Sequence, residues 1–114
     1  SRLARLVEDR RITMLQATPT TWRMLIDSGW RGHDGLKLLC GGEPLPRDLA
    51  ERLTAGGGEL WNLYGPTETT IWSTVDRVQR GDTLVSVGRP IANTKVYVVD
   101  ADRRLVPQGV PGEL

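Results

Sequence analysis

The sequence contains few of the residues from which metal centres and disulfide frameworks are built. Its 114 residues include one cysteine, one histidine and no phenylalanine. A lone cysteine, Cys40, excludes an internal disulfide and a thiolate metal site. A lone histidine, His33, excludes a histidine-based metal cluster and leaves no second histidine to serve as a general base.

An excess of charge of one sign is also missing. The chain has 15 lysines and arginines against 14 acidic residues, which gives a net charge of +1. A balanced chain has no electrostatic reason to bind nucleic acid or an anionic membrane. No apolar run reaches the roughly 18 residues of a membrane-spanning helix, and no signal-peptide pattern opens the sequence. We therefore expect a cytoplasmic protein with no nucleic-acid partner and no membrane partner.

The first part of the chain, residues 1–70, alternates between strand-like and helical patterns. The composition, with 39% hydrophobic and 25% charged residues, is typical of one soluble globular domain. Strand-like segments that alternate with helices predict a parallel sheet with crossover helices, a βαβαβ arrangement. Thr18 and Pro19 form a helix start, and Pro46 opens another helix. The expected helices are residues 2–10, 18–28 and 46–55, and the expected strands are residues 12–17, 36–42 and 59–65.

The second part, residues 71–114, has no helical pattern. Residues 71–75, 83–88 and 95–100 are strand-like, which predicts a β-rich, barrel-like half. We therefore expect an α/β fold in one partial domain over residues 1–114, with an α/β sheet part followed by a β-rich part. The sequence lacks an initiator methionine and ends on a strand-like Gly-Glu-Leu, so we expect an internal piece of a longer chain.

Polar segments follow the three predicted parallel strands where each strand ends. These segments are residues 16–20, 41–46 and 64–70. In open α/β sheets, ligands bind outside the carboxyl ends of the strands, so the segments should meet at one crevice. The third segment, Tyr64 to Thr70, is a dense polar block between two apolar stretches.

The residue types at this crevice suit a nucleotide. Gly41 and Gly42 allow the backbone to approach a flat ligand, and Tyr64 offers a ring for stacking. Thr67 can donate to a phosphate oxygen, and Glu68 can bind Mg²⁺ together with substrate phosphates. A solvated turn followed by a helix cap fits the same residues, and chemistry alone does not separate these interpretations.

Four segments of the sequence resemble one enzyme family. The segments "NLYGPTETT", "VGRPIANTKVYVVD", "LVPQGVPGEL" and "LLCGGEPLP" are similar to those of the adenylate-forming superfamily. The resemblance is to the adenylation domain of nonribosomal peptide synthetases, because the form with Pro66 is commoner there than in acyl-CoA ligases or luciferases. It covers essentially the whole chain, in the family's order and spacing.

The resemblance implies a role for each residue that matches a family motif. Thr67 would donate to the α-phosphate and Glu68 would bind Mg²⁺, and these are the expected catalytic residues. Asn62 would hydrogen-bond the amine edge of adenine, and Tyr64 would stack on the ring. The expected ATP- and AMP-binding set is Gly42, Glu43, Pro44, Asn62, Tyr64, Gly65 and Thr67, in which the first three residues would wrap the adenine.

The resemblance also implies the reaction and its partners. An amino-acid carboxylate would attack the α-phosphate of ATP, and the aminoacyl group would then pass to a phosphopantetheine thiol on a carrier domain. Peptidyl carrier and condensation domains of the parent synthetase are the expected protein partners. The family's phosphate loop, ribose aspartate and catalytic lysine are absent from these residues. We therefore expect the isolated chain to be inactive.

Family positions that line the substrate pocket point to glycine as the amino acid. Trp72 and its bulky neighbours would exclude every side chain larger than hydrogen, which is how a pocket can select glycine. Ile71 and Trp72 are adjacent, so a shared pocket requires an irregular backbone there. Cysteine and alanine are the nearest competing substrates. The matching positions are Gln16, Leu39, Gly41, Leu63, Ile71 and Trp72.

Two other functions fit the same residues. An acyl- or aryl-CoA ligase shares the core and would lack the aspartate that pairs with a substrate amino group. A non-catalytic nucleotide-binding remnant is the alternative outside the enzymes. The flanking sequence would separate these functions from amino-acid activation.

Overall fold

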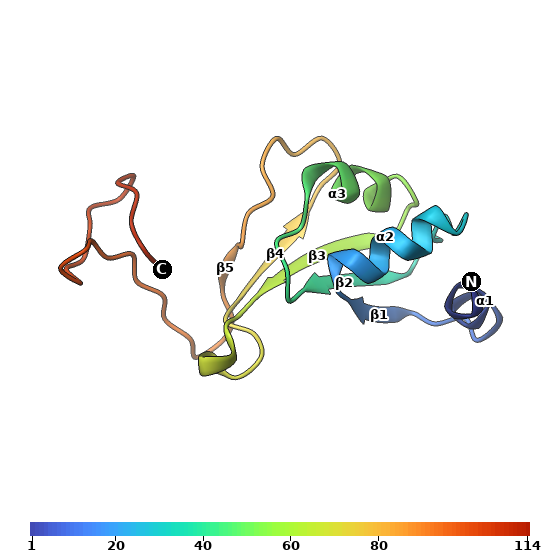
Figure 1. The fold of residues 1–114 in the computed structure, drawn as a ribbon, viewed down its shortest axis with the longest axis horizontal. Coiled ribbons are helices and arrows are strands. Elements are labelled where there is room, and N and C mark those ends of the chain that lie inside the picture. The colour runs from blue at the N-terminus through green and yellow to red at the C-terminus, as the bar shows by residue number, and fades with distance from the viewer.

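The computed structural model describes residues 1–114 and has the predicted α/β character (Figure 1). One sheet has five strands in the order β1-β2-β3-β4-β5. The first three strands are parallel, and β4 and β5 are added antiparallel. The elements are α1 (Arg2–Asp9), β1 (Met14–Ala17), α2 (Pro19–Asp27), β2 (Lys37–Gly41), α3 (Arg47–Thr54), β3 (Glu59–Tyr64), a 3-10 turn (Thr67–Thr69), β4 (Thr74–Val78) and β5 (Arg89–Pro90).

Local capping explains where the helices begin. The Ser1 hydroxyl accepts a hydrogen bond from the Ala4 amide at 3.1 Å and caps α1. Thr18 caps α2 in the same way by accepting from the Thr21 amide at 3.3 Å, and Pro19 follows at the first helical position. These hydroxyls satisfy backbone donors that a helix start leaves free. The predicted start of α2 at Thr18 and Pro19 is confirmed.

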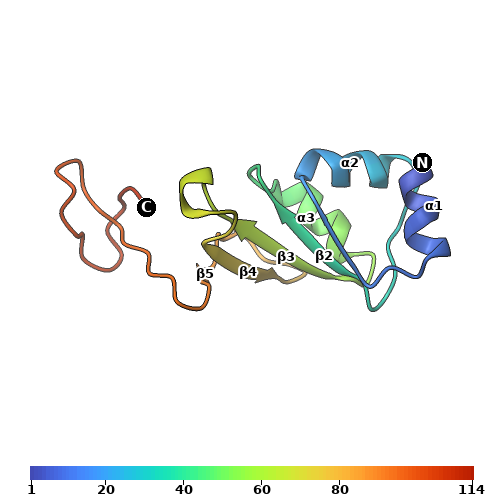
Figure 2. The ribbon, with the colours of Figure 1, turned by 90° about the horizontal axis from the view of Figure 1, so that it is seen from below.

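Helices α2 and α3 lie on one face of the sheet (Figure 2). That face carries the buried side chains of β2 and β3, and the core forms between them and the helices. The other face has no helix over it, so its side chains are exposed or half-buried. The largest fully buried side chains are Trp22, Leu25, Leu36, Leu38, Leu49, Leu60, Val7, Thr74 and Cys40.

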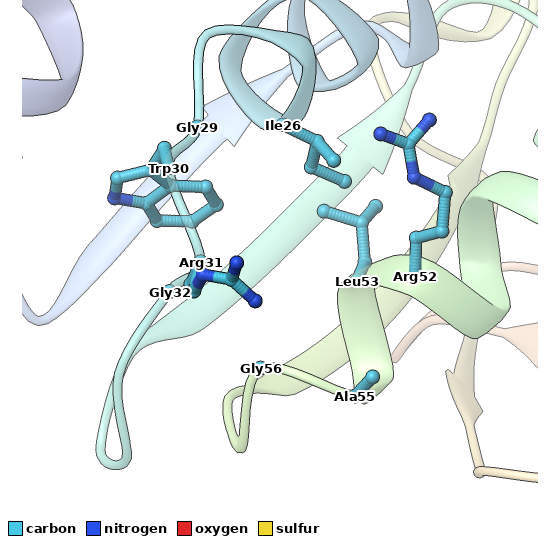
Figure 3. Close-up of a pocket in the computed structure, with 9 residues that line it drawn as sticks. All are labelled: Ile26, Gly29, Trp30, Arg31, Gly32, Arg52, Leu53, Ala55 and Gly56. Atoms are coloured by element: carbon cyan, nitrogen blue, oxygen red, sulfur yellow. The ribbon is translucent and has the colours of Figure 1, made fainter.

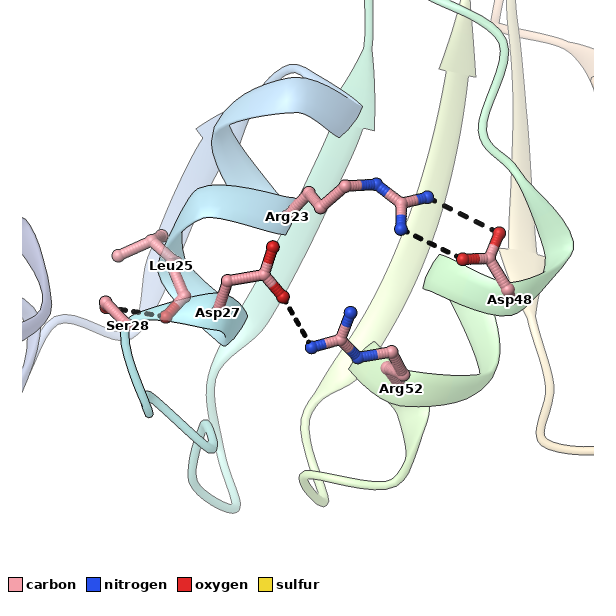
Figure 4. Close-up of polar contacts among 6 residues, drawn as sticks. All are labelled: Arg23, Leu25, Asp27, Ser28, Asp48 and Arg52. Atoms are coloured by element: carbon pink, nitrogen blue, oxygen red, sulfur yellow. Dashed lines mark hydrogen bonds and ion pairs between the residues drawn. The ribbon is translucent and has the colours of Figure 1, made fainter.

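Two ion pairs join α2 to α3 on their exposed surface (Figure 4). Arg23 donates two hydrogen bonds to Asp48, at 3.0 and 3.4 Å. One turn further along, Arg52 of α3 donates to Asp27 of α2 at 2.8 Å. The arginine is thus on α2 in the first pair and on α3 in the second. The Arg23 guanidinium lowers the pKa of the Asp48 carboxyl, chiefly through its hydrogen bonds.

The second half of the chain corrects the sequence prediction. β4 begins at Thr74, so residues 71–73 are not part of the strand. Residues 83–88 form no strand, and within residues 95–100 only Val99 makes isolated bridges, to Leu105 and Glu113. A barrel is not formed by these residues.

Side chains, not a strand ladder, hold residues 83–88 in place. Asn62 Nδ2 donates to the Ser86 carbonyl at 2.7 Å, and Thr74 Oγ1 donates to the Val87 carbonyl at 2.5 Å. The segment is therefore fixed to the sheet, but its backbone groups are not paired in the regular pattern of a strand.

Residues 91–114, after β5, form an arm that extends away from the sheet (Figure 1). The arm gives the molecule extents of 51 × 28 × 21 Å. Apolar side chains on the arm are open to solvent, and Tyr97 is 56% exposed. No helix in the structure combines the length and the apolar character that crossing a bilayer requires.

Candidate nucleotide and amino-acid site

The loops that follow β1, β2 and β3 meet at one end of the sheet. Thr20, at the start of α2, donates a hydrogen bond to Glu43 Oε2 at 2.8 Å and so ties the first loop to the second. Gly42 has a φ of +87°, in the left-handed region that favours glycine, and lets the second loop turn there. The predicted convergence of these loops is what the structure shows.

A pocket of about 380 Å³ lies between the second and third loops. Six of the seven predicted nucleotide-binding residues line it: Gly42, Glu43, Pro44, Asn62, Tyr64 and Gly65. Leu45, Leu63, Pro66 and Val87 complete the wall. The sequence did not predict that Val87 would line the pocket, because a hydrogen bond from Thr74 to its carbonyl brings it there from a distant loop.

Asn62 is buried behind this pocket with one end of its amide already used. The side chain is 6% exposed, and its Nδ2 donates to the Ser86 carbonyl at 2.7 Å. A carbonyl can only accept, so this contact fixes which end of the amide is nitrogen. Oδ1 makes no hydrogen bond within the protein and is the end that can accept one from a ligand.

Tyr64 and the 3-10 turn form the outer edge of the site. Tyr64 lines the pocket and is 38% exposed, so it is accessible to a ligand there. Thr67 and Glu68 stand on the turn that follows, outside the pocket lining, and both are exposed. The structure thus puts these two residues next to the pocket along the chain but does not place them in its wall.

The donors at the turn suit magnesium held jointly with a substrate. No group of three or more histidine, cysteine or acidic side chains is gathered that could hold a metal. Mg²⁺ is commonly bound through one or two carboxylates together with substrate phosphates and water. Glu68, an exposed carboxylate without an ion-pair partner, fits that pattern.

The backbone between the turn and β4 is irregular, as the adjacent pocket positions required. Thr70 and Ile71 have φ values of 62° and 71°, in the left-handed region. Both are β-branched residues, which rarely adopt this conformation. Ile71 is 65% exposed.

The other five predicted pocket residues gather on the face of the sheet that the helices leave open. Gln16 pairs with Leu39 in register, and Gly41 pairs with Leu63, so their side chains point to the same face. The indole of Trp72 lies against Gly41: a Cβ built on that glycine would be 2.5 Å from Trp72 Cη2 and 2.6 Å from Cζ3. The glycine is therefore what allows the indole to lie on β2.

Cys40 lies in β2 next to this glycine and faces the helix-covered side. Its side chain is fully buried, and burial raises the pKa of the thiol to about 12, with a smaller contribution from Glu43. The thiol is therefore protonated near neutral pH and is not a nucleophile.

A larger pocket, of about 560 Å³, lies at the C-terminal ends of α2 and α3 (Figure 3). Trp30, Arg31, Leu53 and Gly56 are among its lining residues. The Trp30 indole nitrogen is buried without a hydrogen-bond partner, and Figure 3 shows it on the side of the ring away from Leu53. No residue predicted from the sequence to bind ligand lines this pocket.

Comparisons with known proteins identify the family. The family model described as AMP-binding enzyme matches residues 1–114. The PKS-NRPS hybrid synthetase ATPKS of Aspergillus niger is 50% identical over 98% of the chain, and a dimodular nonribosomal peptide synthase of Bacillus subtilis is 45% identical over 98%. The chain belongs to the AMP-binding enzyme family and is an adenylation region of the nonribosomal peptide synthetase type.

A solved structure agrees with this assignment. A four-domain nonribosomal peptide synthetase, crystallised with AMP and glycine bound, matches 97% of the chain at 50% identity and a TM-score of 0.91. An N-terminal subdomain from Klebsiella oxytoca, with a TM-score of 0.82 and 22% identity, shares the fold. The chain spans 6% and 5% of the two curated relatives and 8% of the four-domain structure.

Proposed function

We propose that the chain supplies the adenine-binding and amino-acid-selecting part of a domain that activates glycine with ATP. Support comes from the AMP-binding family match over all 114 residues and from the adjacent pocket and indole-covered glycine. Further support is the relative with AMP and glycine bound, at 50% identity. The observation that carries the choice of glycine is the packing of Trp72 on Gly41.

The pocket walls would hold the adenine. The free Oδ1 of Asn62 would accept from the exocyclic amine, and the Tyr64 ring would stack on the base. The backbone of residues 42–44 would close the other side, with Gly42 allowing close approach. Leu45 and Val87 would add apolar contact to the ring edge.

The 3-10 turn would serve the phosphates. The Thr67 hydroxyl would donate to an α-phosphate oxygen, and Glu68 would hold Mg²⁺ against the phosphates. When bound there, magnesium would offset the negative charge that develops as pyrophosphate leaves. The protein's own contribution is to position this carboxylate and hydroxyl beside the adenine pocket.

The reaction would be acyl-adenylate formation. A carboxylate oxygen of the amino acid attacks the α-phosphorus, the bond from that phosphorus to the bridging oxygen breaks, and pyrophosphate departs with the electron pair. No general base is needed, because the carboxylate is already ionised. A phosphopantetheine thiolate on a carrier domain would then take the aminoacyl group and release AMP, and a condensation domain would use the thioester.

Selectivity for glycine would come from exclusion. Trp72 covers the part of β2 where a larger pocket would need space, and Leu39 and Leu63 border it on the same face. The hydrogen side chain of glycine needs no further space. The methyl side chain of alanine would be disfavoured by only about 1–3 kcal/mol. Alanine is therefore the closest competitor.

Amino-acid-dependent exchange of pyrophosphate into ATP tests the proposal. The complete adenylation domain containing residues 1–114 is assayed with each amino acid, and with aryl and fatty acids. Glycine should give the highest rate, with alanine or cysteine next. Preference for a large apolar or charged amino acid would overturn glycine selection, and exchange only with acids that lack an amino group would favour the CoA-ligase alternative.

A further inference from the structure

Two hydroxyl groups close the loop that directly follows the proposed catalytic residues Thr67 and Glu68. The Ser73 Oγ and the Thr69 Oγ1 are 2.5 Å apart across residues 69–73. Thr69 Oγ1 also donates to the Pro66 carbonyl at 3.1 Å. A hydroxyl has one proton to give, so the Ser73 hydroxyl must donate to Thr69. The result is a directed chain from Ser73 through Thr69 to Pro66.

Ser73 is the fixed end of this chain. It is 6% exposed, its amide donates to the Tyr64 carbonyl at 2.8 Å, and its carbonyl accepts from the Ile91 amide at 3.0 Å. Ser73 is therefore held by the end of β3 and by the chain after β5. Thr69, by contrast, is exposed and belongs to the turn.

The loop between these residues needs such a restraint. Thr70 and Ile71 are both in the left-handed region, at φ of 62° and 71°, where β-branched side chains are unfavourable. A conformation of this kind persists only when the surrounding structure fixes it. The remaining ties of the turn and loop are three backbone bonds: the Thr69 amide donates to Pro66 at 3.1 Å, the Thr70 amide to Thr67 at 3.2 Å, and the Trp72 amide to Thr70 at 3.1 Å.

We infer that the Ser73–Thr69 hydroxyl pair is a positioning device that sets Glu68 and Trp72 relative to the nucleotide and amino-acid pockets. Glu68 precedes Thr69 in the turn, and Trp72 precedes Ser73, so each hydroxyl adjoins one residue of the proposed site. The inference rests on the proposed function for its effect on catalysis, and on the structure alone for its effect on the loop.

Three substitutions in the complete adenylation domain separate the hydroxyl pair from the shape of the loop. Thr69→Val keeps the branched shape and removes the hydroxyl, while Thr69→Ser keeps the hydroxyl. Thr70→Val is the matched control, because the Thr70 hydroxyl makes no hydrogen bond within the protein and the residue is likewise exposed. Both changed positions, Thr69 and Thr70, are exposed, so the variants should fold like the parent.

Two readouts are compared, and only one depends on catalysis. Thr69→Val should lower kcat for glycine-dependent exchange about fivefold to tenfold and raise the Mg²⁺ concentration for half-maximal rate, while KM for ATP changes less than about twofold. Without nucleotide or metal, hydrogen exchange at the Trp72 amide should become about fivefold to tenfold faster. Thr69→Ser and Thr70→Val should match the parent in both.

An unchanged Trp72 amide in Thr69→Val, or equal acceleration in Thr70→Val, would overturn the inference. If the parent shows no glycine-dependent exchange, the proposed function fails while the amide readout still decides the role of the hydroxyl pair. If the amide responds as expected but kcat does not, the loop is positioned by the pair and the link to Glu68 is wrong.

Discussion

At the scale of single residues, the atoms left unpaired within the protein are the most informative about ligand binding. Asn62 commits its Nδ2 to the Ser86 carbonyl and keeps Oδ1 free. A family motif can identify the position of this asparagine, but only the tertiary contact determines which end of the amide faces the pocket. The same contact fixes residues 83–88, so Asn62 contributes to the fold as well as to the site.

Tyr64 provides a test of the adenine pocket. Tyr64→Ala removes the ring that lines the pocket and should weaken ATP binding by about 1–3 kcal/mol, as loss of base stacking does elsewhere. The measurement is calorimetric titration of the complete domain with ATP. Tyr64→Phe keeps the ring and should bind nearly as well as the parent. Parental affinity in the alanine variant would remove Tyr64 from the site.

Glu68 tests the proposed metal position. Glu68→Gln keeps the size of the side chain and removes its charge, so kcat should fall roughly 10²-fold or more, as for other groups that stabilise charge in a transition state. KM for ATP should change much less, because the adenine pocket is untouched. Steady-state kinetics over a range of Mg²⁺ concentrations would reveal the change. Parental kinetics would assign the metal elsewhere.

At the scale of elements, the sequence predicts the first half of the fold well and the second half poorly. Helices α1, α2 and α3 and strands β1, β2 and β3 lie where capping residues and apolar spacing indicate. These signals are local, since a Thr-Pro pair starts a helix wherever it stands. Residues 83–88 and 95–100 have strand composition, but a strand also needs a neighbour to pair with.

The candidate site divides in the same way. The predicted nucleotide-binding residues could be found from the sequence, because they lie in two short continuous segments, residues 42–44 and 62–67, that each match a family motif. Val87 was not, because its place in the pocket wall depends on a hydrogen bond from Thr74, 13 positions earlier in the chain. Ile71 shows the opposite case: the pattern groups it with Trp72, and the backbone turns its side chain to solvent.

The contact between Trp72 and β2 predicts a specific packing defect. Gly41→Ala adds a methyl group 2.5 Å from the indole and 2.7 Å from the Leu63 carbonyl, so the loop must shift. Overpacking of this kind costs typically about 1–3 kcal/mol, and thermal unfolding of the complete domain should show it. Combining Gly41→Ala with Trp72→Leu should restore part of the loss, whereas strictly additive effects would mean that the two residues do not touch.

The ion pair between α2 and α3 predicts a weak, pH-dependent contribution. The pKa of Asp48 is lowered in the folded chain, so its stabilising effect is present above the ordinary value of about 4 and is lost as pH falls through the lowered pKa. Asp48→Asn should therefore lower the unfolding temperature slightly near pH 7, and the difference from the parent should shrink in acid or at high salt.

Leu49→Ala, at the buried neighbouring position, is the control for the ion pair. It should cost about 2–5 kcal/mol at any pH or salt concentration, because it leaves a cavity in the core. A difference between Asp48→Asn and the parent that grows in acid would contradict the direction assigned to the Asp48 pKa.

At the scale of the whole molecule, these 114 residues leave much surface that a larger domain would cover. Only 19 residues are buried, one face of the sheet has no helix over it, and the arm after β5 projects into solvent. The proposed adenine pocket also has no lysine or arginine in its lining that could offset the charge of departing pyrophosphate. The proposed site thus has residues suited to the base and one nearby carboxylate, and no cationic side chain in its lining.

The isolated chain should therefore be inactive and marginally stable. We expect no pyrophosphate exchange above background with any amino acid, and unfolding at low urea concentration by circular dichroism. The complete domain under the same conditions is the control. Exchange by the isolated chain would show that residues 1–114 contain a sufficient catalytic set, and a urea midpoint as high as that of the complete domain would contradict the low stability.

Competition among amino acids tests the central claim most directly. The complete domain is given ATP, Mg²⁺ and an equimolar mixture of the twenty common amino acids, and the aminoacyl adenylate formed is identified by mass spectrometry. The packing of Trp72 against Gly41 predicts glycyl adenylate as the main product, with alanyl adenylate as the largest minor one. A main product with a large side chain, such as leucyl or phenylalanyl adenylate, would contradict the account.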